Sequence, residues 1–181
     1  MNNIEQFSLY TAKIFEELYD SFPISIGVDP NQFITDCLLF NKDEELQDLK
    51  NKKEMAQLLV MFDNLKETEK IKEKLPEIEK AYSSLENEKM NEVKYQKAIF
   101  SSTLDFLISE GLVRRPEDRG CVLTAKAFSH LNKNFKHGAL NNEDSTYIKT
   151  IKSIFSSTTD AAEKIGIGVA VKVIPSLLGI S

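Results

Sequence analysis

Two histidines and one cysteine are the side chains most suited to forming a catalytic or metal site. His130 and His137 stand seven residues apart, and Cys121 precedes His130 by nine residues. Structural zinc sites use closely spaced cysteine and histidine pairs, and these three residues do not match such a spacing. We therefore expect His130 on a helix surface, His137 in a linker, and no metal site.

Nucleophiles and carboxylates are present, but their arrangement indicates no active site. Glu16, Glu17 and Asp20 cluster in one segment, where paired carboxylates could do acid–base work. A solvated helix face is the more common role of such a cluster. The serine pairs at 101–102 and 156–157 have no histidine near them in the sequence to activate a hydroxyl. We predict a non-enzymatic protein that needs no cofactor.

Neither the glycines nor the overall charge predict phosphate or nucleic-acid binding. The sequence has no GxxxxGKS or GxxxxGKT loop and no GxGxxG after a strand, and the pair Gly166 and Gly168 stands in an apolar tail. The formal net charge is −5, whereas nucleic-acid binders use basic residues to neutralise phosphates. A nucleic-acid interface in this chain must therefore be local.

The length and the cysteine content indicate the number of domains and the cellular compartment to expect. A chain of 181 residues with 41% hydrophobic residues fits one elaborated domain or two small ones. Cys37 and Cys121 stand in apolar runs, which is typical of buried free thiols. The first twenty residues are polar and amphipathic rather than a signal peptide, so we expect a cytoplasmic protein.

The N-terminal segment predicts two helices separated by a short strand. Apolar residues at helical spacing predict a first helix with Asn3 as its cap and Gln6 three residues later, ending before Pro23. Residues 24–28 alternate as in a strand. Asp29 followed by Pro30 is a strong helix start, and this second helix is expected to run to about residue 40.

Residues 42–92 predict a charged helical hairpin. Two apolar stripes with spacings of three and four residues resemble short coiled-coil seams, and they are out of phase with each other. We expect one arm over about 43–72, a reversal between Lys66 and Pro76, and a return arm that runs to Glu110. The stripes are the predicted surface for self-association or partner binding: Met55, Leu58, Phe62, Leu65, Ile71, Leu75, Ile78, Tyr82 and Leu85.

The sequence pattern after this hairpin predicts the end of a helix, a small two-stranded wing and another helix. Gly111 fits the position after a helix end, where a left-handed conformation is needed. LVRR and CVLT are predicted as strands around the polar turn PEDRG, and Thr124 is a good cap for the helix that follows.

The order of these elements resembles the winged helix-turn-helix superfamily. FLISEGLVRR is similar to the end of a recognition helix that enters the wing, and VLTAKAFSHL is similar to the entry of the helix after it. Ala127 stands where many members carry glycine. The resemblance implies a mainly α fold with a small β-wing over residues 1–41 and 93–133, with the hairpin as an insertion.

The resemblance also implies which residues would contact DNA in a DNA-binding member of this superfamily. The third helix would enter the major groove and the wing would contact the backbone. The candidate residues are Lys94, Lys97, Ser101, Ser102, Arg114, Arg115 and Arg119. The neighbouring acids Asp105, Glu110, Glu117 and Asp118 oppose phosphate binding, so this interface is the weaker expectation.

The C-terminal part consists of a predicted linker, 134–144, and an apolar helical segment, 145–181. On a helix, Gly168, Lys172, Ser176 and Gly179 form one narrow polar strip. The apolar run is too short to span a bilayer. It could dock on the domain or on a second subunit, or lie in a membrane interface, through Ile165, Ile167, Val169, Val171, Val173, Ile174, Leu177, Leu178 and Ile180.

Three functions therefore follow from the sequence. The first is an interaction or scaffold protein that forms a homo-oligomer or binds a protein partner through the hairpin or the tail. The second is a DNA-binding regulator of winged-helix type. The third is an effector that binds a membrane peripherally through its tail.

Overall fold

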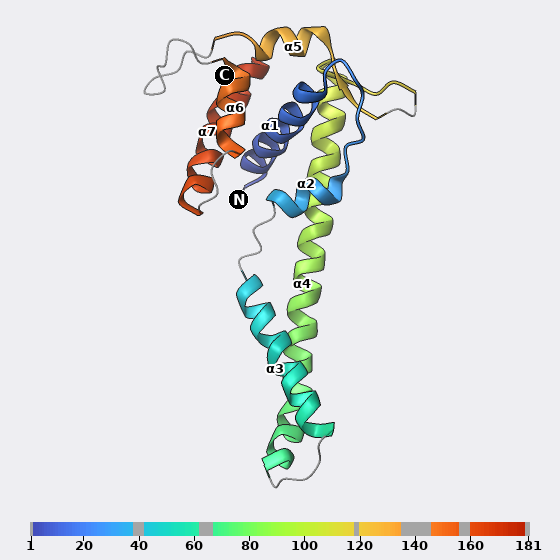
Figure 1. The fold of residues 1–181 in the computed structure, drawn as a ribbon, viewed down its shortest axis with the longest axis vertical. Helices are drawn as coiled ribbons and strands as arrows, with labels where there is room; N and C mark the ends of the chain where they lie inside the picture. The colour runs from blue at the N-terminus through green and yellow to red at the C-terminus, as the bar shows by residue number, and fades with distance from the viewer. Residues whose placement is uncertain are drawn as a thin grey trace. The chain divides into compact units, whose positions relative to one another are not determined.

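The computed structural model describes residues 2–37, 42–61, 67–117, 120–134, 146–155 and 160–179, and it is mainly helical with one small antiparallel sheet (Figure 1). The chain divides into two compact units, one of Met1–Cys37 with Lys97–Ser181 and one of Leu38–Gln96. The elements are α1 (Asn3–Ser21), α2 (Pro30–Cys37), α3 (Asp43–Met61), α4 (Glu67–Ser109), β1 (Val113–Arg114), β2 (Val122–Leu123), α5 (Ala125–Leu131), α6 (Tyr147–Phe155) and α7 (Asp160–Leu178).

Helix α1 begins with a capping box, one residue earlier than predicted. The Asn2 side chain accepts from the Glu5 amide at 2.9 Å, and the Glu5 carboxylate accepts from the Asn2 amide at 2.8 Å. Asn2, rather than Asn3, is therefore the cap, because only this register places an acid three residues later. The predicted Asn3–Gln6 pair is wrong, and Gln6 is instead buried.

Aromatic side chains join α1, α2 and the C-terminal end of α4 into one core. The Tyr10 ring meets the Phe100 ring edge to face, with centroids 5.6 Å apart. The Phe33 ring of α2 approaches Phe100 at 5.1 Å. All three side chains are almost completely buried, so this cluster fixes α2 and α4 against α1.

The small sheet has two strands and one further bridge. β1 and β2 are antiparallel, with Val113 opposite Leu123. Ile26 forms an isolated bridge with Cys121 through two backbone hydrogen bonds of 2.9 and 2.7 Å. The strand predicted at 24–28 is therefore reduced to one bridging residue.

The predicted helix end at Gly111, between α4 and β1, is confirmed in detail. Gly111 has φ +65°, its amide donates to the Ile108 carbonyl, and the Leu112 amide donates to the Leu107 carbonyl, each at 3.0 Å. These two bonds are the Schellman pattern that ends a helix. The Thr124 hydroxyl, as predicted, caps α5 by accepting from the Ala127 amide at 3.2 Å.

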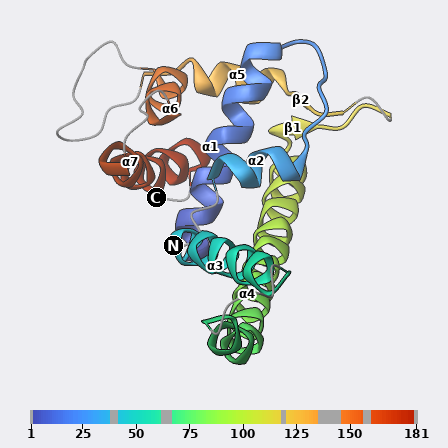
Figure 2. The same cartoon turned by 60° about the horizontal axis from the view of Figure 1, so that its bottom comes forward.

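Helix α7 packs against α1 and α6, and Figures 1 and 2 both show it beside them. Its inner face is formed by Ala170, Val173 and Ile174, all of which have no exposed surface. The Tyr147 and Ser176 hydroxyls lie 3.0 Å apart, which adds a polar contact between α6 and α7. The C-terminal helix is thus part of the core of its own unit.

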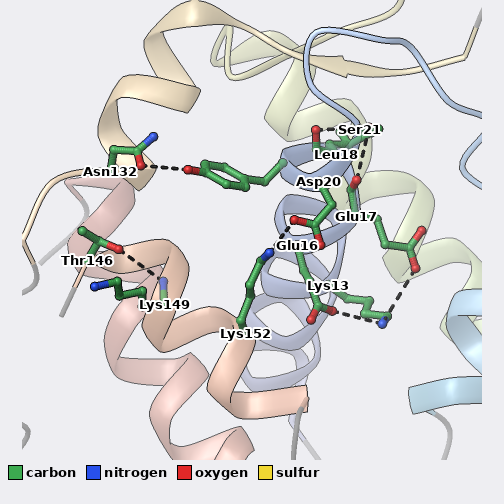
Figure 3. Close-up of polar contacts among 11 residues, drawn as sticks. Lys13, Glu16, Glu17, Leu18, Asp20, Ser21, Asn132, Thr146, Lys149 and Lys152 are labelled. Atoms are coloured by element: carbon green, nitrogen blue, oxygen red, sulfur yellow. Dashed lines mark hydrogen bonds and ion pairs between the residues drawn. The ribbon is translucent and has the colours of Figure 1, made fainter.

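Polar and aromatic contacts join α6 and the end of α5 to α1 (Figure 3). The Lys152 ammonium pairs with the Asp20 carboxylate and lies 5.7 Å from the centre of the Tyr19 ring. The Tyr19 hydroxyl donates to the Asn132 side chain at 2.8 Å, and its ring stacks on Phe128. These contacts hold α5 and α6 against α1.

The other unit consists of α3 and the N-terminal part of α4, which run antiparallel. The Lys42 ammonium pairs with Glu88 at 2.8 Å near the start of α3, and Gln57 donates to Glu79 at 3.0 Å near its end. The predicted first arm to Lys72 is wrong, because α3 ends at Met61 and α4 already begins at Glu67.

Pro76 lies inside α4 instead of marking the reversal. Proline removes one backbone hydrogen bond and usually breaks a helix. In α4 the half-buried stripe continues on both sides of the proline, from Ile71 and Leu75 to Ile78 and Tyr82. Packing of this stripe keeps the helix continuous through the proline.

Candidate functional site

The most distinctive surface of the described residues is an apolar patch at the end of α3. Met55, Leu58, Leu59 and Met61 have exposed fractions of 66%, 55%, 42% and 80%. We call these four residues the α3 apolar face. Clustered exposure of large apolar side chains on one short segment marks interaction sites more often than isolated exposure does.

A hollow of about 560 Å³ adjoins this face, within the same unit. It is lined by apolar residues of α3 and α4, by two carboxylates and by one amide: Leu58, Val60, Met61, Leu75, Glu54, Glu79 and Gln57. The Gln57 amide donates to Glu79, so these two polar groups of the lining are hydrogen-bonded to each other. The hollow extends the apolar surface from α3 onto α4.

The structure separates the nine residues predicted for self-association into two groups. Met55 and Leu58 are exposed, whereas the α4 residues Ile71, Leu75, Ile78 and Tyr82 are half-buried and Leu85 is buried. Phe62 and Leu65 lie outside the described residues. The α4 stripe therefore packs within the unit, and the exposed surface comes from α3.

A different stripe of α3 lies on its less exposed side. It consists of half-buried residues around the buried Ala56, at spacings of three and four: Leu46, Leu49, Lys53, Ala56 and Val60. The Lys53 ammonium lies 4.6 Å from the centre of the Tyr82 ring of α4, which explains how a lysine fits in this stripe. Sequence reasoning missed this stripe because alanine and lysine look like surface residues.

The two stripes of α3 can be tested by one matched pair of substitutions. We expect Ala56→Lys to destabilise the helical unit by about 2–4 kcal/mol, because a long charged side chain must enter a 6% exposed site. Met55→Lys should change stability by less than about 0.5 kcal/mol. Urea unfolding followed by circular dichroism at low protein concentration measures both, and equal effects would contradict the assigned register.

The residues predicted to contact nucleic acid are exposed but share their surface with acids. Lys94, Lys97, Ser101 and Ser102 of α4 are exposed, as are Arg114 and Arg115, whereas Arg119 lies outside the described residues. Asp105, Glu110 and Glu117 are exposed as well. The exposed Arg114 and Arg115 are therefore accompanied in the sequence by carboxylates that oppose phosphate binding.

The predicted tail residues divide between a buried and an outer face of α7. Val173 and Ile174 are buried, and Val169, Val171, Leu177 and Leu178 are half-buried. Gly168, Lys172 and Gly179 of the predicted polar strip are exposed. The side chains of Ile165 and Ile167, and all of Ile180, lie outside the described part. Among the described helices, none combines the length and apolar content needed to cross a bilayer.

The three carboxylates that could do acid–base chemistry are each paired with a lysine. Glu16 and Glu17 pair with Lys13 at 3.1 and 3.8 Å, and Asp20 pairs with Lys152 (Figure 3). Within the described ranges, His, Cys, Asp and Glu form no group of three or more that could hold a metal ion. Cys121 is a buried free thiol, as predicted; Cys37 and His137 were also assigned from the sequence, but their side chains are not described.

His130 is the one histidine that the structure describes. Its side chain lies on α5, and partial burial lowers its pKa, with further lowering by the positive charges of Lys133 and Lys126. The imidazole is thus held in its neutral form more firmly than an exposed histidine would be.

Comparison with known proteins gives no match, neither to a family model, nor to a curated protein, nor to a solved structure.

Proposed function

We propose that this chain is a non-enzymatic interaction protein that self-associates through the α3 apolar face. The observation that carries the proposal is the exposure of four large apolar side chains beside a hollow of about 560 Å³. Burial of apolar surface stabilises an association by roughly 25 cal/mol per Å². The α3 apolar face and the hollow share Leu58 and Met61, and this continuous apolar surface favours a protein partner over solvent.

A second copy of the chain is the partner that this face suits. Met55, Leu58 and Leu59 follow the spacing of three and four residues by which helices pair. In a two-fold dimer the same face appears on both partners, so a helix of this pattern can pack against its own copy. The methionines suit such a surface because their flexible, polarizable side chains adapt to a partner.

The proposed scaffold for this unit is a winged-helix core. The hydrogen-bonded order Ile26, β2, β1 and the packing of α1, α2 and the end of α4 support that arrangement. In sequence, the helical unit is then an insertion between α2 and the last turns of α4. The fold in itself names no activity, so the functional proposal depends on the surface of α3.

The two alternative functions have less support. DNA binding would use Arg114 and Arg115, yet the exposed carboxylates Glu110 and Glu117 stand close to them in the sequence. Peripheral membrane binding would need the apolar side of α7, and that side includes Val173 and Ile174, which are buried in the domain.

The self-association proposal predicts a change of mass in solution. Light scattering of the wild-type chain at tens of micromolar should give at least twice the chain mass of 20.5 kDa. The double variant Met55→Lys, Leu58→Lys should give the chain mass, because two charges in each copy would have to be buried in the contact.

The matched control is Asn87→Lys with Asn91→Lys, which adds the same charge to exposed positions of α4 in the same unit. This control should associate like the wild type. A monomeric wild type, or a Met55 and Leu58 double variant that associates normally, would count against the proposal.

A further inference from the structure

A second hollow lies in the other unit, where the end of α4, the start of β1, α5 and the end of α7 meet. Its volume is about 280 Å³, near the lower end of the range of small-molecule sites. Its lining combines four apolar and three polar side chains: Phe106, Leu112, Leu177, Leu178, Glu110, Lys126 and His130. An apolar wall with a few polar groups is the usual composition of a ligand site.

The polar end of this hollow is electropositive at the His130 ring. The charges of Lys133 and Lys126 both lower the pKa of His130, and no carboxylate counteracts them there. Glu110 is the one acid in the lining, and its side chain is exposed. The Lys126 ammonium donates to the Glu110 backbone carbonyl at 3.4 Å, so it is held beside another residue of the lining. An anion would therefore be stabilised beside Lys126 and His130.

We propose that this hollow binds a small amphipathic carboxylate. Its carboxylate would accept hydrogen bonds from the Lys126 ammonium and the His130 ring, and its apolar part would cover Phe106, Leu112 and the two leucines of α7. The limited volume selects a single short chain or ring over a lipid with two chains. Because Leu177 and Leu178 belong to α7, a bound ligand connects α7 to α5 and to the end of α4.

Binding of such an anion is linked to protonation of His130. A carboxylate beside the ring offsets the charges of Lys126 and Lys133 and raises the pKa of His130. The protonated ring in turn binds the anion more tightly. Affinity should therefore increase as the pH falls through the pKa of His130.

The test uses octanoate as the probe, with octan-1-ol and octylamine as probes of the same chain length and different charge. The chain has two histidines, so an NMR titration follows two imidazoles, and His130→Gln assigns the signal of His130. Octanoate should raise the pKa of His130. Lys126→Gln should weaken octanoate binding by about tenfold, because a charge-assisted hydrogen bond is lost.

Lys149→Gln is the control, since this exposed lysine of α6 does not line the hollow. It should bind octanoate with unchanged affinity. Three results would overturn the proposal: no shift of the His130 signals with octanoate, equal affinities for octanoate and octanol, or a Lys126→Gln variant that binds like the wild type. Because none of these residues belongs to the α3 apolar face, a monomeric protein would leave this result unaffected.

Discussion

Replacing Gly120 by alanine is expected to lower the thermal midpoint of the protein by roughly 10 °C. Gly120 has φ +86°, a conformation that residues with a side chain rarely adopt. A Cβ atom there would lie 2.2 Å from the Ile26 carbonyl oxygen and 2.5 Å from its carbon. Both atoms are backbone, so the contact cannot be relieved by a rotamer change.

The expected loss of stability arises mainly at the bridge between Ile26 and Cys121. Two backbone hydrogen bonds of 2.9 and 2.7 Å form that bridge. Moving the strands apart to admit a methyl group breaks both, at about 1 kcal/mol each, in addition to about 1–2 kcal/mol for the left-handed backbone. Calorimetry should therefore show a total loss of about 3–4 kcal/mol.

Gly111→Ala provides the matched control. Gly111 also has a positive φ of +65°, but nothing lies within 4 Å of the position of its Cβ atom. This variant should lose only the backbone contribution of about 1–2 kcal/mol. If the two variants unfold at the same temperature, the close approach of Ile26 to Gly120 is not what limits this position.

The features that the sequence predicted well are those with short-range causes. Gly111, Thr124 and the start of α2 at Pro30 were located because caps and turns depend on a few neighbouring residues. The bridge at Ile26 depends on Cys121, which lies far along the chain. Its partner could not be read from the alternation of residues 24–28, and neither could the need for glycine at 120.

The register of α3 shows why the stripe that packs against α4 was not the one predicted from the sequence. Met55 and Leu58 belong to one stripe of α3, and Leu49 and Ala56 belong to another. Hydrophobicity alone favours the stripe with methionine and leucine as the inner one. Close packing against α4 instead selects the stripe with the small Ala56, which lets the helices approach. The same choice leaves the larger apolar residues exposed, and this surface is the basis of the functional proposal.

Helix α7 raises a different question, because its sequence favours docking over membrane contact but allows both. Which alternative holds depends on the surfaces of α1 and α6, and these are tertiary features that no local pattern encodes. With Val173 and Ile174 completely buried, docking accounts for the inner face of the helix. Of the narrow polar strip, Gly168, Lys172 and Gly179 are exposed, whereas Ser176 is half-buried against Tyr147 of α6.

Val173→Asp is expected to destabilise the protein by more than about 4 kcal/mol, because it buries an unpaired carboxylate between α7 and its neighbours. Val173 has no exposed surface, whereas Val171 on the same helix is half-buried. Val171→Asp should cost about 1 kcal/mol, since its carboxylate can reach water. Thermal unfolding of the two variants measures the difference, and similar midpoints would contradict the docked orientation of α7.

The same pair distinguishes docking from membrane binding. A helix that inserts into a bilayer interface uses all its large apolar residues, so both aspartates would weaken flotation with anionic liposomes to a similar extent. If α7 is docked through Val173, its inner face is already covered, and we expect that the wild-type protein does not float. Flotation of a stably folded wild type that both substitutions abolish would therefore show that α7 leaves the domain, and it would reverse the assignment of its inner face.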